Sequence, residues 1–64
     1  MKLYIQKDRA RISFKFNGTV KELLDRIAVN PETVMVTKNG AVVPEDATIE
    51  DSDSIEVLPV VSGG

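Results

Sequence analysis

The sequence contains no cysteine, no histidine and no tryptophan. Without cysteine, the chain has no disulfide, no thiol nucleophile and no thiolate ligand for a metal ion. Without histidine, it lacks the side chain that most often serves as a general base near neutral pH and as a metal ligand. These absences argue against a chain that is an enzyme in its own right.

Long apolar runs are also missing. No segment approaches the roughly 20 apolar residues that a membrane-spanning helix requires, and the N-terminus lacks the apolar core of a signal peptide. We therefore expect a cytoplasmic protein without a membrane partner. Hydrophobic residues make up 42% of the 64 residues and charged residues 28%, a composition that is ordinary for a single small globular domain.

The formal net charge of −2 argues against nucleic acid as a partner, because phosphate binding requires a basic face. The charge is unevenly distributed: residues 1–26 carry a net charge of +4, and residues 27–64 carry −6. One interpretation is that the two halves attract each other in the folded domain; the other is an acidic face that steers a basic partner. The acidic residues between positions 45 and 53 lack the spacing and the glycine of an EF-hand loop, so we expect solvated turns and no metal site.

The chain begins with two segments, residues 2–6 and 11–16, in which polar and apolar side chains alternate. This is the period of a half-buried strand, and the short polar link between them predicts an antiparallel hairpin. The side chains expected on the inner face are Leu3 and Ile5 in the first segment and Ile12, Phe14 and Phe16 in the second.

After Asn17-Gly18 the apolar period changes from two residues to 3.6, which predicts a helix. Thr19 and Glu22 have the spacing of a capping box, in which each side chain accepts a hydrogen bond from the other's backbone N–H. The expected apolar stripe consists of Val20, Leu23, Leu24 and Ile27. The helix should end before Pro31, because the residue that precedes a proline is disfavoured in the α region.

The second half of the chain contains three further β-rich segments. Asn39-Gly40, between residues 33–37 and 41–43, predicts a type I′ turn and a second hairpin. Residues 45–53 are acidic and loop-like, with room for one short turn around Thr48-Ile49. Residues 54–61 form the last predicted strand, which we expect beside the first strand, where it would cover a long exposed edge.

This order of elements predicts an α+β domain over residues 1–61. We expect a mixed sheet of four to five strands with one helix packed on one face. Residues 62–64, Ser-Gly-Gly, are expected to form a flexible tail. Because glycine has no Cβ, such a tail can thread a channel too narrow for other side chains. A frayed terminus or a cloning remnant would look the same.

This layout resembles the β-grasp of ubiquitin-like proteins, and it is most similar to the small prokaryotic sulfur carriers of thiamine and molybdopterin biosynthesis. The segments that carry the resemblance are Thr19–Leu24, Val36–Val43, Asp51–Val57 and Val60–Gly64. They span almost the whole chain, and the Gly-Gly end is part of the match. The N-terminal hairpin is longer than expected of the shortest thiamine-type carriers, which leaves the pathway open.

The resemblance implies that the Gly64 carboxylate is adenylated by an ATP-dependent, E1-like partner enzyme. A sulfur donor enzyme would then displace AMP and leave a C-terminal thiocarboxylate, which an acceptor biosynthetic enzyme uses. Ser62 and Gly63 would thread into the partner's active site. The chain itself would bind no cofactor and act as substrate and carrier.

A docking surface is expected next to the tail. If Ile55 and Val57 face the core, then Leu58 and Val60 face outward. We expect these two residues to form a partner-binding apolar surface, which Val61, and Met35 or Val36 on a neighbouring strand, would extend. The alternative is that strand twist or Pro59 returns the outward side chains to the core.

Two other functions fit the same sequence. A ubiquitin-like modifier would use the same activated Gly64 but form an isopeptide bond with lysines of target proteins. A plain β-grasp binding module would use its sheet or edge strand, with an incidental tail. The sequence does not identify the receiving pathway, whether thiamine, molybdopterin or tRNA thiolation.

Overall fold

A computed structural model describes residues 1–60 of the chain. In chain order the elements are β1 (Lys2–Ile5), β2 (Ala10–Ser13), β3 (Gly18–Thr19), α1 (Val20–Arg26), the 3₁₀-helix η1 (Pro31–Thr33), β4 (Val34–Lys38), β5 (Ala41–Val43), β6 (Thr48–Ile49) and β7 (Ser54–Pro59). Neither helix in the described part of the chain is long and apolar enough to cross a membrane.

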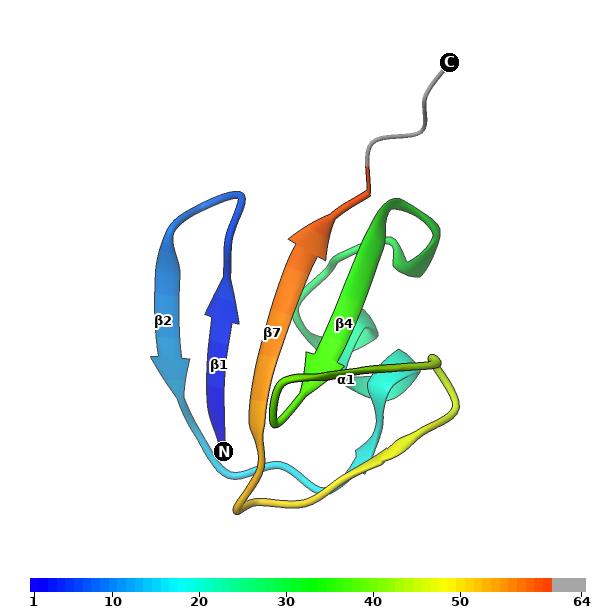
Figure 1. Ribbon diagram of the computed structural model, residues 1–64. Helices are drawn as coiled ribbons and strands as arrows, with labels where there is room; N and C mark the ends of the chain where they lie inside the picture. Colours follow the sequence, from blue (N-terminus) through cyan, green and yellow to red (C-terminus); the bar gives the residue numbers. More distant parts are fainter. Residues whose placement is uncertain (61–64) are drawn as a thin grey trace.

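The main sheet has five strands in the order β2-β1-β7-β4-β5 (Figure 1). The last strand, β7, lies at its centre, parallel to β1 and antiparallel to β4. Helix α1 lies behind β4 and covers one face, so the domain has two layers. The predicted α+β class, the mixed sheet with a single α-helix and the pairing of the last strand with the first are confirmed.

Two local signals in the sequence, the capping box at Thr19 and Glu22 and the type I′ turn at Asn39-Gly40, predict the structure correctly. Thr19 Oγ1 accepts a hydrogen bond from the Glu22 N–H at 3.2 Å, and Glu22 Oε1 accepts one from the Thr19 N–H at 3.0 Å, which completes the capping box. Asn39 and Gly40 both have positive φ, 52° and 89°, as a type I′ turn requires. The turn joins β4 to β5.

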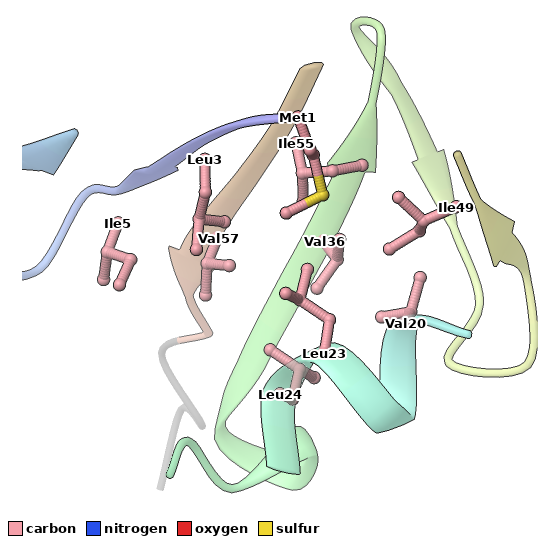
Figure 2. Packing of buried hydrophobic residues seen from close by; sticks show 10 residues of the cluster. All are labelled: Met1, Leu3, Ile5, Val20, Leu23, Leu24, Val36, Ile49, Ile55 and Val57. Carbon is pink, nitrogen blue, oxygen red and sulfur yellow. The ribbon is translucent and has the colours of Figure 1, made fainter. Parts of the chain in front are cut away.

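The core lies between α1 and the inner face of the sheet (Figure 2). Its buried side chains are Met1, Leu3, Ile5, Val20, Leu23, Leu24, Val36, Ile49, Ile55 and Val57. Fully burying one such aliphatic side chain stabilises a fold by about 1.5–3 kcal/mol. The alternation of side chains along β7 thus buries Ile55 and Val57 as expected. It directs Glu56 and Leu58 to the face of the sheet away from α1.

Strand β2 is shorter than predicted and its inner face is less covered. It ends at Ser13, and Phe14 and Phe16 pack against the core beyond the end of the strand. Ile12 lies opposite the buried Leu3, on the helix side of the sheet, but it is 41% exposed. Ile12 thus lies on the expected face but is not part of the core, because β2 is an edge strand that α1 does not reach.

The predicted turn around Thr48-Ile49 is instead strand β6, which pairs antiparallel with β3. The preceding loop also caps the helix: the Val20 and Lys21 N–H groups donate to the carbonyls of Ala47 and Glu45 at 2.9 and 2.8 Å. These contacts satisfy N–H groups that the first turn of a helix leaves free. They hold Ile49 in the core, where a solvated loop would have left it exposed.

Candidate functional site

The register between β4 and β7 determines which side chains face away from the helix. Val36 lies opposite Val57, and Met35 lies opposite Leu58. Val57 is buried, so the first pair faces α1 and the second pair lies on the outer face of the sheet. Directly opposite side chains in an antiparallel pair have Cβ atoms about 4.5–5.5 Å apart, so Met35 and Leu58 are neighbours.

Met35 and Val36 therefore have different environments. Met35 is 39% exposed on the outer face, whereas Val36 is only 4% exposed. The expectation that Val36 extends the docking surface is wrong, because its side chain is directed between Val43 and Val57 toward the core. Of the two, only Met35 can meet a partner.

A residue that the sequence analysis missed also lies on this face. Val42 is opposite Thr37, the next outward residue of β4 after Met35, and it is 63% exposed. The signal was available in the sequence: a type I′ turn at Asn39-Gly40 places positions 37 and 42 opposite each other. We call the exposed Met35, Val42 and Val60, together with the half-buried Leu58, the apolar surface.

Val60 follows the last residue of β7 and is 49% exposed. Its N–H donates to the Thr33 carbonyl at 3.0 Å, which fixes the backbone at the last described residue. Val60 and Met35 line an open hollow of about 340 Å³ together with Val20 and Leu24 of α1. Pro59 therefore does not return Val60 to the core, and the side chain stays available at the rim of this hollow.

The remaining predicted site residues lie outside the described residues. They are Val61, Ser62, Gly63 and Gly64. Their roles in docking, threading and activation stay predictions, as does the boundary between a domain of residues 1–61 and a tail of residues 62–64.

The other half of the outer face is polar. Tyr4 of β1 lies between Arg11 of β2 and Glu56 of β7. The Arg11 guanidinium carbon lies 5.5 Å from the centroid of the Tyr4 ring, a cation–π distance. An open hollow of about 590 Å³ extends from these residues to Thr37 of β4. Glu56 of the acidic half of the chain is thus near Arg11 of the basic half.

The acidic segment forms hydrogen-bonded turns. Asp53 accepts from the Glu50 N–H at 2.8 Å and from Asn39 Nδ2 at 3.0 Å, and these bonds lower the pKa of its carboxyl below the ordinary value. Asp51 Oδ1 accepts from the Met1 ammonium at 3.1 Å and from the Phe16 N–H at 3.3 Å, which lowers the pKa of that carboxyl. Within residues 1–60, no group of three or more acidic side chains is arranged to hold a metal ion.

The chain matches a known protein family over almost its whole length. The model described as ThiS family matches residues 3–64. "Sulfur carrier protein TtuB" of Thermus thermophilus is 30% identical over 57 residues, which cover 89% of this chain and 88% of the relative. An uncharacterized protein of Archaeoglobus fulgidus is 34% identical over 62 residues, which cover 95% and 91%.

Solved structures give the same result. The crystal structure of a thiamine biosynthesis protein (ThiS) from Geobacter metallireducens covers 100% of both chains, with 31% identity and a TM-score of 0.68. The solution structure of a thiamine biosynthesis protein from the same organism covers 100% of this chain and 88% of that one, with 30% identity and a TM-score of 0.59. This likeness supports the predicted β-grasp fold.

Proposed function

The chain belongs to the ThiS family, and we propose that it is a sulfur carrier that is activated and loaded at the Gly64 carboxylate. The resemblance to the β-grasp sulfur carriers inferred from the sequence is confirmed at the level of the family. As a member of this family the chain is a carrier and not a catalyst.

The main support for this proposal is that the family match includes both the folded domain and the C-terminal residues. The family model extends to residue 64 and so includes the Gly-Gly end. The relative from Thermus thermophilus, itself named a sulfur carrier, aligns over nearly all of both chains. A shared fold alone would not distinguish a carrier from a binding module.

The proposed chemistry begins with a partner enzyme, because a carboxylate is a poor electrophile. An adenylating enzyme joins the Gly64 carboxylate to the α-phosphate of ATP and releases pyrophosphate. A persulfide sulfur on a donor enzyme then attacks the acyl carbon and AMP leaves. Reductive cleavage of the resulting acyl disulfide by a thiol leaves the thiocarboxylate, whose sulfur an acceptor enzyme takes.

The apolar surface supplies a place for the adenylating enzyme to dock. Its members lie on β4, on β5 and at the end of β7, next to the start of the tail. Exposed apolar groups gathered beside a functional segment are typical of a protein–protein contact. Val61 would continue this contact, and Ser62 and Gly63 would enter the partner's ATP site. We place the carrier in the cytoplasm, where ATP and such enzymes meet.

Intact-mass spectrometry tests the proposal directly. The protein is purified after co-expression with the adenylating enzyme and the sulfur donor of its host. We expect a gain in mass equal to one oxygen exchanged for sulfur, and we expect it to be absent from a Gly64 deletion variant, the matched control.

Two other outcomes of this experiment would contradict the proposed carrier function. An unchanged mass together with covalent conjugates on target lysines would indicate a ubiquitin-like modifier. An unchanged mass without ATP-dependent AMP release would leave a binding module and remove the proposed role of the tail.

A further inference from the structure

Strand β2 is an edge of the main sheet with free backbone groups. Met1 and Phe14 exchange both backbone hydrogen bonds, from the Met1 ammonium to the Phe14 carbonyl at 2.9 Å and from the Phe14 N–H to the Met1 carbonyl at 3.1 Å. Bonded and non-bonded pairs alternate along an antiparallel ladder. Arg11 and Ser13 therefore direct their N–H and C=O groups away from β1, where another strand could pair with them.

The edge carries a concentrated positive charge. Arg11 lies on β2 itself, Lys7 and Arg9 lie in the turn that precedes it, and Lys15 follows its end; the one acidic residue among them is Asp8. All four cationic side chains are exposed, and none of them forms an ion pair with another residue in the range 1–60. An extended segment of opposite charge would gain attraction here without displacing an existing pair.

The two faces of the edge differ in polarity. Arg11 and Tyr4 occupy the outer face, and the exposed Ile12 occupies the helix side. A strand added to β2 alternates its own side chains between these faces. The best match is a segment in which acidic residues alternate with aliphatic ones, so that the acids meet Arg11 and the aliphatic side chains cover Ile12.

We propose that the β2 edge binds an acidic, extended segment of a partner protein as an added sixth strand of the main sheet. A second copy of this chain is a poorer occupant, because antiparallel pairing of two β2 strands would place like charges together. The opposite edge is also poorer, because β5 has only three residues and is followed by Pro44. Basic residues on an edge strand discourage pairing with other strands in general. An acidic strand is the exception, because its charges are attracted to the basic residues.

This interaction would leave the proposed sulfur chemistry free to proceed. The β2 edge and the β4–β5 part of the apolar surface lie at opposite sides of the sheet, separated by β1 and β7 (Figure 1). A partner on β2 could therefore remain bound while an adenylating enzyme occupies the apolar surface. The inference goes beyond the carrier function and does not depend on it.

The test uses the full chain and a blocked peptide of about eight alternating Glu and Val residues, long enough for one strand. Binding is followed by amide NMR shifts and by hydrogen exchange. We expect the Arg11 and Ser13 amides to shift and to exchange more slowly. Arg11→Glu and a rise in salt should each weaken binding by at least about tenfold.

Two proline variants form a matched pair. Ser13→Pro removes an outward N–H from β2 without breaking a bond to β1, and proline is tolerated at such edge positions. Val42→Pro does the same at β5, because Val42 is one residue beyond the bonded pair that flanks the Asn39-Gly40 turn. We expect Ser13→Pro to abolish peptide binding and Val42→Pro to leave it unchanged.

Peptide controls keep the test decisive if Ser13→Pro does not fold. A Lys–Val peptide and a Glu–Val peptide with N-methylated pairing amides should both fail to bind. Equal binding of the Lys–Val peptide, protection of β5 amides in place of β2 amides, or no binding of the Glu–Val peptide would overturn the proposal.

Discussion

Asp53 connects two turns that are distant in the sequence. Its carboxylate accepts from the Glu50 N–H and from the Asn39 side chain, while Asn39 Oδ1 accepts from the Ser54 N–H at 2.9 Å. The β4–β5 turn is thereby fastened to the entry of the central strand. The charged form of Asp53 accepts these bonds best, which is why the pKa of its carboxyl falls below 3.8.

We expect Asp53 to make stability depend on acid pH. Because its pKa is lower in the folded state, the unfolded state binds more protons near pH 4, and the stabilisation is present above that pH and lost as the pH falls through the folded pKa. Asp53→Asn should lower the free energy of unfolding at pH 7 and make it less sensitive to acid. Urea unfolding between pH 2 and pH 7 measures both effects.

Asp46→Asn is the matched control, because the Asp46 side chain makes no hydrogen bond or ion pair within residues 1–60. Its acid dependence should follow that of the wild type. An identical pH profile for Asp53→Asn and the wild type would show that the contacts of Asp53 do not contribute.

At the scale of elements, α1 depends on its cap. The helix has only seven residues, too few to be stable alone in water. We expect Thr19→Ala to lower the free energy of unfolding by about 1 kcal/mol, because it removes the Thr19 half of the capping box. Lys21→Ala, on the exposed side of the same turn, should change it by less than about 0.5 kcal/mol. Equal urea midpoints for the two variants would refute the role of the cap.

The elements that sequence reasoning predicted are those with local causes. The helix cap spans the four positions from Thr19 to Glu22, and the type I′ turn depends on Asn39-Gly40 alone. Strand β6 has no such signal, because its two residues pair with β3, about 30 positions earlier in the chain. Its existence depends on where the helix places the preceding loop.

The predicted site was incomplete for a related reason. Val34, Met35 and Val36 are all apolar, so alternation does not show which of them faces the core. Only the register with β7 decides this, and it buries Val36 and exposes Met35. Leu58 and Val60 were easier to place, because Ile55 and Glu56 set the alternation of their strand.

At the scale of the whole molecule, stability depends on a small core. Leu24→Ala should lower the free energy of unfolding by about 2–5 kcal/mol, because it leaves a cavity between α1 and the sheet. Leu24→Asp should abolish folding, because it buries an unpaired charge. Val42→Ala, at an exposed site, is the control and should change stability little. Circular dichroism during urea unfolding distinguishes these results, and a folded Leu24→Asp variant would contradict the assigned core.

The apolar surface makes a different prediction. Val60→Asp should leave the circular dichroism spectrum and the urea midpoint unchanged, because the side chain is exposed. It should reduce AMP release with the adenylating enzyme by at least about tenfold, as a charge placed in an apolar contact does. Lys21→Asp, on the exposed face of α1, should have little effect on AMP release. An unfolded Val60→Asp protein would refute the surface assignment, and full AMP release would refute its role in docking.

The position of β7 has a consequence for how the protein is made. Among the described strands, the central strand β7 comes last in the chain, and residues 6–53 separate it from its parallel neighbour β1. A nascent chain that has not reached Pro59 can form hairpins but cannot close the sheet or complete the core. Translation must therefore pass Pro59 before the domain can fold, so chains that stop before the end of β7 lack the folded surface that a partner would bind.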